Sequence, residues 1–144
     1  MKTLDATSAQ NGPLKLTVSG MPVAMCRHHH KNPLDDDFMI WLIHELKDRE
    51  ASLPAGKEQG MLVFKKYLCG ACGKELAAKS ERRQGFALEL AYEDTPAFRA
   101  ELEMPVYKCT GCGKEQLHSL KAIQGITSQT IAAFNDAAGF PHSG

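Results

Sequence analysis

Two segments of the chain carry the same nine-residue pattern, and each contains a pair of cysteines. Residues 67–75 read YLCGACGKE and residues 107–115 read YKCTGCGKE, so six of the nine positions are identical. Two thiolates spaced Cys-x-x-Cys on a tight turn can reach one metal ion, and four thiolates complete a tetrahedral site. The spacing therefore predicts one four-cysteine metal site whose ligands are Cys69, Cys72, Cys109 and Cys112.

A glycine follows the second cysteine of each pair, as Gly73 and Gly113. Such a glycine lets the backbone curl back, so that its amides can donate hydrogen bonds to the sulfurs. Because zinc is the usual ion of closed four-thiolate sites, we expect Zn²⁺ as the cofactor. The repeated Cys-x-x-Cys-Gly also resembles the rubredoxin knuckle, which makes a rubredoxin-like iron electron carrier an alternative. Aromatic residues, which surround the iron of rubredoxins, make up only 7% of this chain.

The 36 residues between the two pairs, 73 to 108, contain the pattern of a β-hairpin. Residues 85–93 alternate apolar and small or polar side chains, Asp94-Thr95-Pro96 forms a turn, and residues 97–109 return as a second strand. Pro105 restricts the last part of that strand to a sheet edge. Two such strands bring the second pair back beside the first, which is the plan of a zinc ribbon. We therefore predict an α+β fold containing a zinc ribbon, two Cys-x-x-Cys knuckles joined by a β-hairpin, with flanking helices.

A fainter copy of the second pair lies near the N-terminus. Residues 21–34 match residues 104–117 at six of fourteen positions, with Cys26 at the place of Cys109 and His29 at the place of Cys112. Cys-x-x-His is an acceptable half of a zinc site. Two interpretations stay open for this degenerate N-terminal repeat. Cys26 and His29 bind a second metal, or Cys26 is a buried residue followed by a solvated turn.

Helical patterns flank the predicted ribbon. Apolar residues recur with helical spacing from Leu34 to Glu50, and Asp35 to Asp37 then lie in the first turn, where carboxylates are favourable. Residues 116–124 also read as helical, and Thr127 or Ser128 can cap a last helix that runs through Ala138. Composition and turn signals divide the chain into a flexible N-terminus, a strand–knuckle–helix unit, a linker, the zinc ribbon, and a C-terminal helix with a tail: 1–13, 14–51, 52–60, 61–124 and 125–144.

Over residues 67–124, well under half of the chain, the sequence resembles the YgiT-type (MqsA-like) zinc-finger family of antitoxins. The resemblance rests on the first Cys-x-x-Cys-Gly, a hairpin, the strand MPVYKC at residues 104–109, the second Cys-x-x-Cys-Gly and a helix. In that family the zinc is structural, the zinc domain contacts a partner toxin, and a following helix-turn-helix domain binds DNA. The resemblance implies a protein partner and the ligands Cys69, Cys72, Cys109 and Cys112. Only 32 residues follow Cys112, too few for a full DNA-binding domain of that type.

Composition and motifs narrow the function classes. The chain has 17 basic and 17 acidic residues, so no net charge attracts nucleic acid. Lys79, Arg82 and Arg83 in the segment KSERR are candidate nucleic-acid contacts, and a nucleic-acid-binding zinc-ribbon transcription factor is an alternative function. A closed thiolate site leaves no position for activated water, and no phosphate-binding glycine loop, GxSxG or HExxH motif is present. We therefore expect that the protein is not an enzyme and that it has no small-molecule substrate.

The remaining sequence features favour a protein that acts by binding another protein. The predicted helix 34–50 carries Met39 and Trp41 on a broad apolar arc, which favours a protein partner or a homodimer. No apolar stretch approaches the roughly 20 residues that span a bilayer, and five cysteines argue against a disulfide framework. We therefore expect a cytoplasmic, regulatory, antitoxin-like zinc protein without membrane contact.

Overall fold

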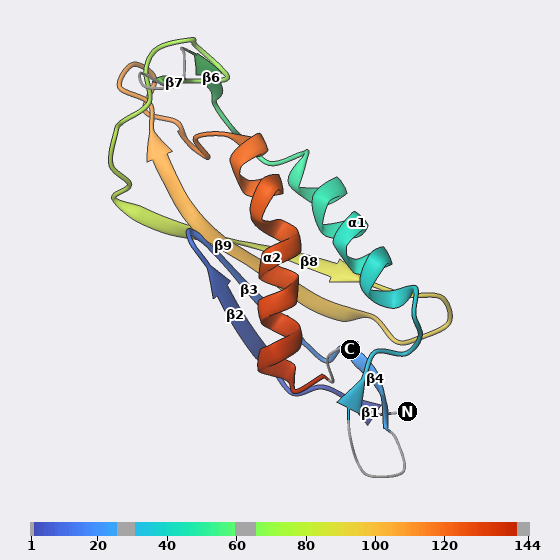
Figure 1. Cartoon of the computed structure of the whole chain (residues 1–144). Coiled ribbons are helices and arrows are strands. Elements are labelled where there is room, and N and C mark those ends of the chain that lie inside the picture. The colour runs from blue at the N-terminus through green and yellow to red at the C-terminus, as the bar shows by residue number, and fades with distance from the viewer. Residues whose placement is uncertain (1, 26–30, 60–65, 141–144) are drawn as a thin grey trace.

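The computed structural model of the chain describes residues 2–25, 31–59 and 66–140 (Figure 1). Cys26 and His29 lie outside these residues, so the second metal site stays a prediction. The two helices are α1 (Phe38–Glu50) and α2 (Leu120–Ala138). The strands are β1 (Lys2–Thr3), β2 (Thr7–Asn11), β3 (Leu14–Ser19), β4 (Pro22–Met25), β5 (Lys31–Asn32), β6 (Lys57–Gln59), β7 (Lys66–Leu68), β8 (Arg82–Leu90), β9 (Phe98–Lys108) and β10 (Glu115–Gln116).

The protein is an α+β fold built on one main antiparallel sheet. Its strands follow the order β8-β9-β3-β2, and β10 pairs with the last residues of β9. The hairpin predicted between the cysteine pairs is present as β8 and β9, which pair without interruption from Arg82 opposite Val106 to Leu90 opposite Phe98. This hairpin carries the second cysteine pair at the end of its longer strand.

The N-terminal strand β3 joins this hairpin directly. It pairs with β9 from Lys15 opposite Glu103 to Ser19 opposite Arg99, so β9 lies at the centre of the sheet. At Pro105, β9 has a neighbour only on the β8 side, because its pairing with β3 ends at Glu103. The proline that lacks an N–H thus occupies a local edge, as expected from its chemistry.

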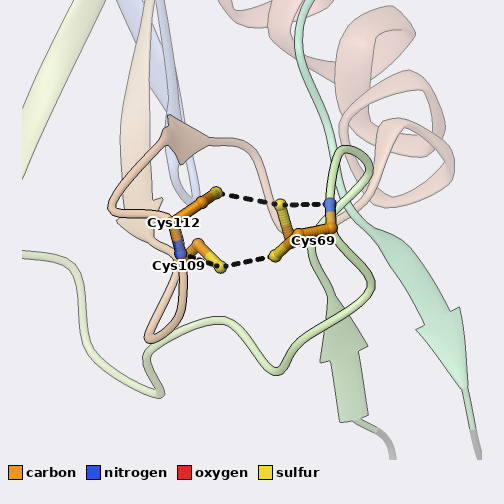
Figure 2. Close-up of side chains that lie close together, drawn as sticks. Cys69, Cys109 and Cys112 are labelled. Carbon is orange, nitrogen blue, oxygen red and sulfur yellow. Dashed lines mark hydrogen bonds between the residues drawn. The ribbon is translucent and has the colours of Figure 1, made fainter.

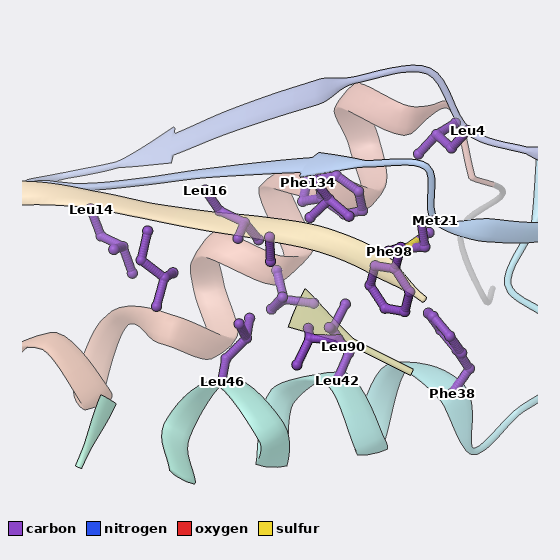
Figure 3. Packing of buried hydrophobic residues seen from close by; sticks show 14 of the residues in the cluster. Leu4, Leu14, Leu16, Met21, Phe38, Leu42, Leu46, Leu90, Phe98 and Phe134 are labelled. Carbon is purple, nitrogen blue, oxygen red and sulfur yellow. The ribbon is translucent and has the colours of Figure 1, made fainter. Parts of the chain in front are cut away.

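Both helices cover the same face of the sheet, with α2 against β2 and β3 and α1 beside α2 (Figure 1). Strand β3 alternates strictly, and its apolar residues Leu14, Leu16 and Val18 are fully buried. Figure 3 shows Leu16 of β3 and Phe134 of α2 within this core together with Leu42 of α1. The core therefore lies between the helices and one face of the sheet, while the opposite face is polar.

Helix α1 begins four residues later than predicted. It starts at Phe38, and the preceding aspartates are not in its first turn. Asp35 instead accepts the backbone N–H of Asp37 at 3.0 Å and the buried hydroxyl of Tyr92 at 2.9 Å. The carboxylate that the sequence pattern assigned to the helix is thus used in a tertiary contact with Tyr92, two residues beyond β8.

Helix α2 is one continuous helix where the sequence predicted two. Ser119 caps it by accepting the backbone N–H of Ala122, and it ends at Gly139, whose φ of 78° is left-handed. Thr127 lies inside it and bonds the buried carboxylate of Glu50 at 2.8 Å, so it is not a cap. In the described part of the chain, neither helix is long and apolar enough to cross a membrane.

Candidate metal centre

The four predicted cysteines converge at one place, and Figure 2 shows Cys69 facing Cys109 and Cys112. The Sγ atoms of Cys69 and Cys112 are 3.7 Å apart, those of Cys72 and Cys109 are 3.4 Å apart, and all four lie within 4.8 Å of one another. None of the four is in a disulfide. A tetrahedral ion with metal–sulfur bonds of about 2.3 Å requires sulfurs about 3.8 Å apart. The donor set therefore fits a single metal ion.

Different elements bring the two pairs together. Cys69 follows β7, which pairs with β6, whereas Cys109 follows the central strand β9. Isolated bridges join the two halves, because Leu76 pairs with Cys109 and Ala55 pairs with Leu117. The second pair is thus anchored in the main sheet, while the first pair is held by a short two-stranded ribbon and by contacts with the second.

The two turns have the same backbone geometry, as their repeated sequence predicts. The N–H of Gly73 donates to the carbonyl of Cys69 at 3.0 Å, and the N–H of Gly113 donates to the carbonyl of Cys109 at 3.1 Å. The glycines have φ values of 78° and 77°, in the left-handed region that other residues rarely adopt. We call these turns the first knuckle (69–74) and the second knuckle (109–114).

Each knuckle directs backbone amides at its first sulfur. The sulfur of Cys69 accepts hydrogen bonds from the N–H groups of Ala71 and Cys72 at 3.3 and 3.4 Å. The sulfur of Cys109 accepts the equivalent pair, from the residues two and three positions further on, at the same two distances. Such donors favour the thiolate form that binds metal.

These contacts separate the acidities of the cysteines. The N–H donors, that of Cys72 first, lower the pKa of Cys69 to about 6, although burial opposes them. The same type of donor, that of Cys112 first, lowers the pKa of Cys109. A backbone hydrogen bond from Lys114 lowers the pKa of Cys112. The thiol of Cys112 also forms hydrogen bonds with the neighbouring sulfurs, that of Cys109 first, and these bonds together with burial raise its pKa to about 11. A bound cation would balance the charge of four thiolates at this spacing.

Gln116 contacts the centre, and the sequence analysis missed it. Its side chain is 2% exposed, its Nε2 donates to the sulfur of Cys69 at 3.2 Å, and its Oε1 accepts the N–H of Gly70 at 2.9 Å. It stands one position beyond the nine-residue repeat, where the first copy has the buried Leu76. That difference between otherwise similar copies is the only signal the sequence carried.

A stack of three rings lies next to the knuckles and was also missed. The ring of His118 stacks with Tyr107 at a centroid distance of 3.3 Å and with Tyr67 at 4.2 Å, with interplanar angles of 13° and 8°. The Nε2 of His118 is 3.1 Å from the carbonyl of Ala77, and burial lowers the pKa of His118. A neutral imidazole thus joins the two tyrosines that open the repeats.

The three residues predicted to contact nucleic acid differ in their surroundings. Lys79 is exposed. Arg82 donates to the carboxylate of Glu115 at 2.6 Å, and Arg83 donates to that of Glu103 at 2.8 Å. The two arginines therefore neutralise carboxylates of the sheet and of β10 instead of forming an unpaired basic surface.

Comparison of the chain with protein-family models, curated proteins and solved structures finds no match. Resemblance to the antitoxin family therefore rests on the residues quoted above.

Proposed function

We propose that the protein binds one Zn²⁺ in a zinc ribbon and acts by contact with a protein partner, without catalysis. The ligands are Cys69, Cys72, Cys109 and Cys112. The single observation that carries the proposal is the convergence of four free sulfurs within 4.8 Å of one another, at separations close to those of a tetrahedral thiolate site.

A structural role for the ion follows from how little else is buried nearby. Among the described residues, the apolar cluster around the knuckles has three buried members, Cys69, Leu76 and Cys109. Such a cluster is too small to hold two turns and a two-stranded ribbon in place, because a small unit buries little apolar surface. When bound, zinc supplies this missing folding free energy by crosslinking the knuckles.

Partner binding is favoured over catalysis and over nucleic acid for separate reasons. A site of four cysteines has no ligand position left for water or substrate. Arg82 and Arg83 pair with glutamates, and α2, which follows the second knuckle, packs on the sheet. The resemblance of residues 67–124 to antitoxins gives this partner role a regulatory, antitoxin-like form.

Native mass spectrometry with elemental analysis tests the metal. We expect one zinc per chain, lost when Cys72 and Cys112 are both changed to Ser and retained in Cys26→Ser. Cys26→Ser is the matched control because Cys26 is the one cysteine outside the two Cys-x-x-Cys pairs. A colourless protein is expected; a red protein containing iron, or a chain purified with no metal, contradicts the proposal. A second zinc that Cys26→Ser removes supports the separate prediction for Cys26 and His29.

A further inference from the structure

Strand β8 is a sheet edge that lacks several of the usual protections against pairing with another strand. Among the described residues it pairs only with β9, over nine residues in unbroken register and therefore without a bulge. Its sequence, RRQGFALEL, contains no proline and no lysine. The opposite edge, β2, has five residues of the sequence TSAQN and is packed by α2. Proteins commonly blunt long edges with such features or with charged side chains, and β8 has only the charged ones, Arg82, Arg83 and Glu89, so its edge can still accept another strand.

The side chains of β8 form two distinct rows. Phe86 and Leu88 lie opposite the buried residues Leu102 and Ala100, on the helix-covered face, yet both are only half-buried. Gly85 and Ala87 are exposed on the other face, where the side chain of Glu101 on β9 lies beside Gly85. The edge thus offers unused apolar surface on its helix-covered face.

The charges of β8 are complementary to those of a second β8 strand in the antiparallel direction. When two copies pair about Phe86, Phe86 lies opposite Phe86, and Gly85 lies opposite Ala87. In this register Arg83 of each copy lies opposite Glu89 of the other. A parallel arrangement in register instead sets arginine against arginine. Opposite charges and aromatic pairs directly across an antiparallel ladder are stabilising, and like charges are not.

We propose that a second copy of this chain is the partner that occupies the β8 edge, joining two main sheets into one through a two-fold axis at Phe86. The arrangement is isologous, so every favourable pair occurs twice. Arg83 already donates from Nε to the carboxylate of Glu103 and from Nη2 to the carbonyls of Pro13 and Glu103, which leaves its Nη1 to donate to a second carboxylate. This inference rests on the contact role in the proposed function and specifies its partner and its surface.

Charge reversal at the edge tests the proposal without touching the core. Glu89→Arg is expected to raise the dissociation constant of the dimer about tenfold, because it sets two arginine pairs in opposition. Arg83→Glu is expected to weaken the dimer in the same way, through two opposed pairs of glutamates. An equimolar mixture of the two variants is expected to form a heterodimer, because position 83 of each chain then faces a side chain of opposite charge at position 89 of the other.

The readout is sedimentation over a concentration range, with native mass spectrometry of the mixture. Asp5→Arg is the matched control, since it makes the same charge change at an exposed residue near the opposite edge of the sheet. Three results overturn the proposal: a strict monomer, a dimer that Glu89→Arg leaves unaffected, and a dimer that the two variants weaken but that mixing them does not restore. The same spectra report zinc: a zinc-bound monomer removes only the β8 dimer, and a dimer without metal removes only the zinc site.

Discussion

Two regions of this molecule are stabilised in different ways. The first, which we call the sheet body, comprises β2, β3, β8, β9 and the two helices, and its core contains 21 buried residues among those described. The second, the cysteine end, comprises β6, β7, β10 and the two knuckles, and its separate cluster contains three. Apolar burial stabilises a fold roughly in proportion to the area removed from water. The sheet body can therefore be held together by its own core, whereas the cysteine end, under the proposed function, depends on a bound ion.

Within the cysteine end, the two knuckles differ in their support. The second continues the central strand β9, while the first continues the three-residue strand β7, which pairs with β6 and otherwise forms a single bridge, from Leu68 to Glu75, in the described chain. The two knuckles share a repeated sequence, so their turns are alike. The strands that hold them in place are not. The first knuckle should therefore be the part of the molecule most sensitive to loss of metal.

Removal of the metal should have the largest effect on the difference between the sheet body and the cysteine end. On chelation, we expect backbone amides of residues 66–76 to lose protection from hydrogen exchange by several orders of magnitude, because the crosslink supplies most of their folding free energy. Amides of β3 and of β9 residues 99–103 should retain their protection. Hydrogen exchange measured by mass spectrometry checks both expectations. Equal loss throughout the chain shows that the two regions are one cooperative unit.

Truncation in the core probes the sheet body alone. Leu42 is fully buried in α1, and Leu42→Ala is expected to reduce the free energy of unfolding by about 2–5 kcal/mol. Ile40→Ala in the same helix is the matched control, because Ile40 is 57% exposed and its truncation should cost less than about 0.5 kcal/mol. Urea denaturation followed by circular dichroism gives both values. Zinc content should stay the same in both variants, and its loss in Leu42→Ala contradicts the division.

Gln116→Leu sharpens the difference between the knuckles, because it gives the second copy the apolar residue type found at Leu76 in the first. It removes the donor to the Cys69 sulfur and leaves the N–H of Gly70 without its acceptor. Zinc affinity is expected to fall about 10- to 100-fold in competition with a chelator. Gln124→Leu is the control, since the amide of Gln124 bonds the carbonyl of Lys47, away from the cysteines. Unchanged affinity in Gln116→Leu shows that the glutamine only fills space.

The two regions should respond to pH in opposite directions. The pKa of Cys69 is lowered from 9.0 to about 6, so its contribution to the cysteine end is present above pH 9.0 and is lost as pH falls toward about 6. Burial raises the pKa of Glu50 above 4.5, so its contribution to the sheet body is present below pH 4.5 and is lost as pH rises through the higher value in the folded protein.

Glu50→Gln tests the smaller of these effects, the pH dependence that Glu50 gives to the stability of the sheet body. The variant keeps a hydrogen-bonding group beside Thr127 but removes the buried charge. At pH 8 it should be more stable than the wild type, by on the order of 1 kcal/mol, and the difference should shrink toward pH 4.5. Glu45→Gln, a change at a more exposed glutamate of the same helix, is the matched control. Thermal unfolding at several pH values measures both, and a pH-independent difference for Glu50→Gln argues against a raised pKa.

The parts of this fold that the sequence predicts are those governed by short-range geometry. Four cysteines and two glycines define the knuckles, because the turn that presents two sulfurs is completed within six residues. The hairpin was predictable because its side chains alternate across a single turn. The pairing of β3 with β9 was not, since residues as far apart in the chain as Lys15 and Glu103 meet only when both apolar rows close on the helices. Gln116 and His118 are ordinary polar residues in sequence, and only folding sets one on a sulfur and the other on two tyrosine rings.

By itself the sequence determined which four cysteines could share one metal ion and the geometry of their turns, because a Cys-x-x-Cys turn requires only residue type, spacing and a residue able to adopt positive φ. Tertiary structure alone decided which strands flank β9, where α1 begins, and that α2 runs on through Thr127. Each of those outcomes balances a local preference against burial of surface from distant parts of the chain. For Asp35 and Thr127, contacts with Tyr92 and Glu50 prevailed over the helix ends that their neighbours in sequence favour.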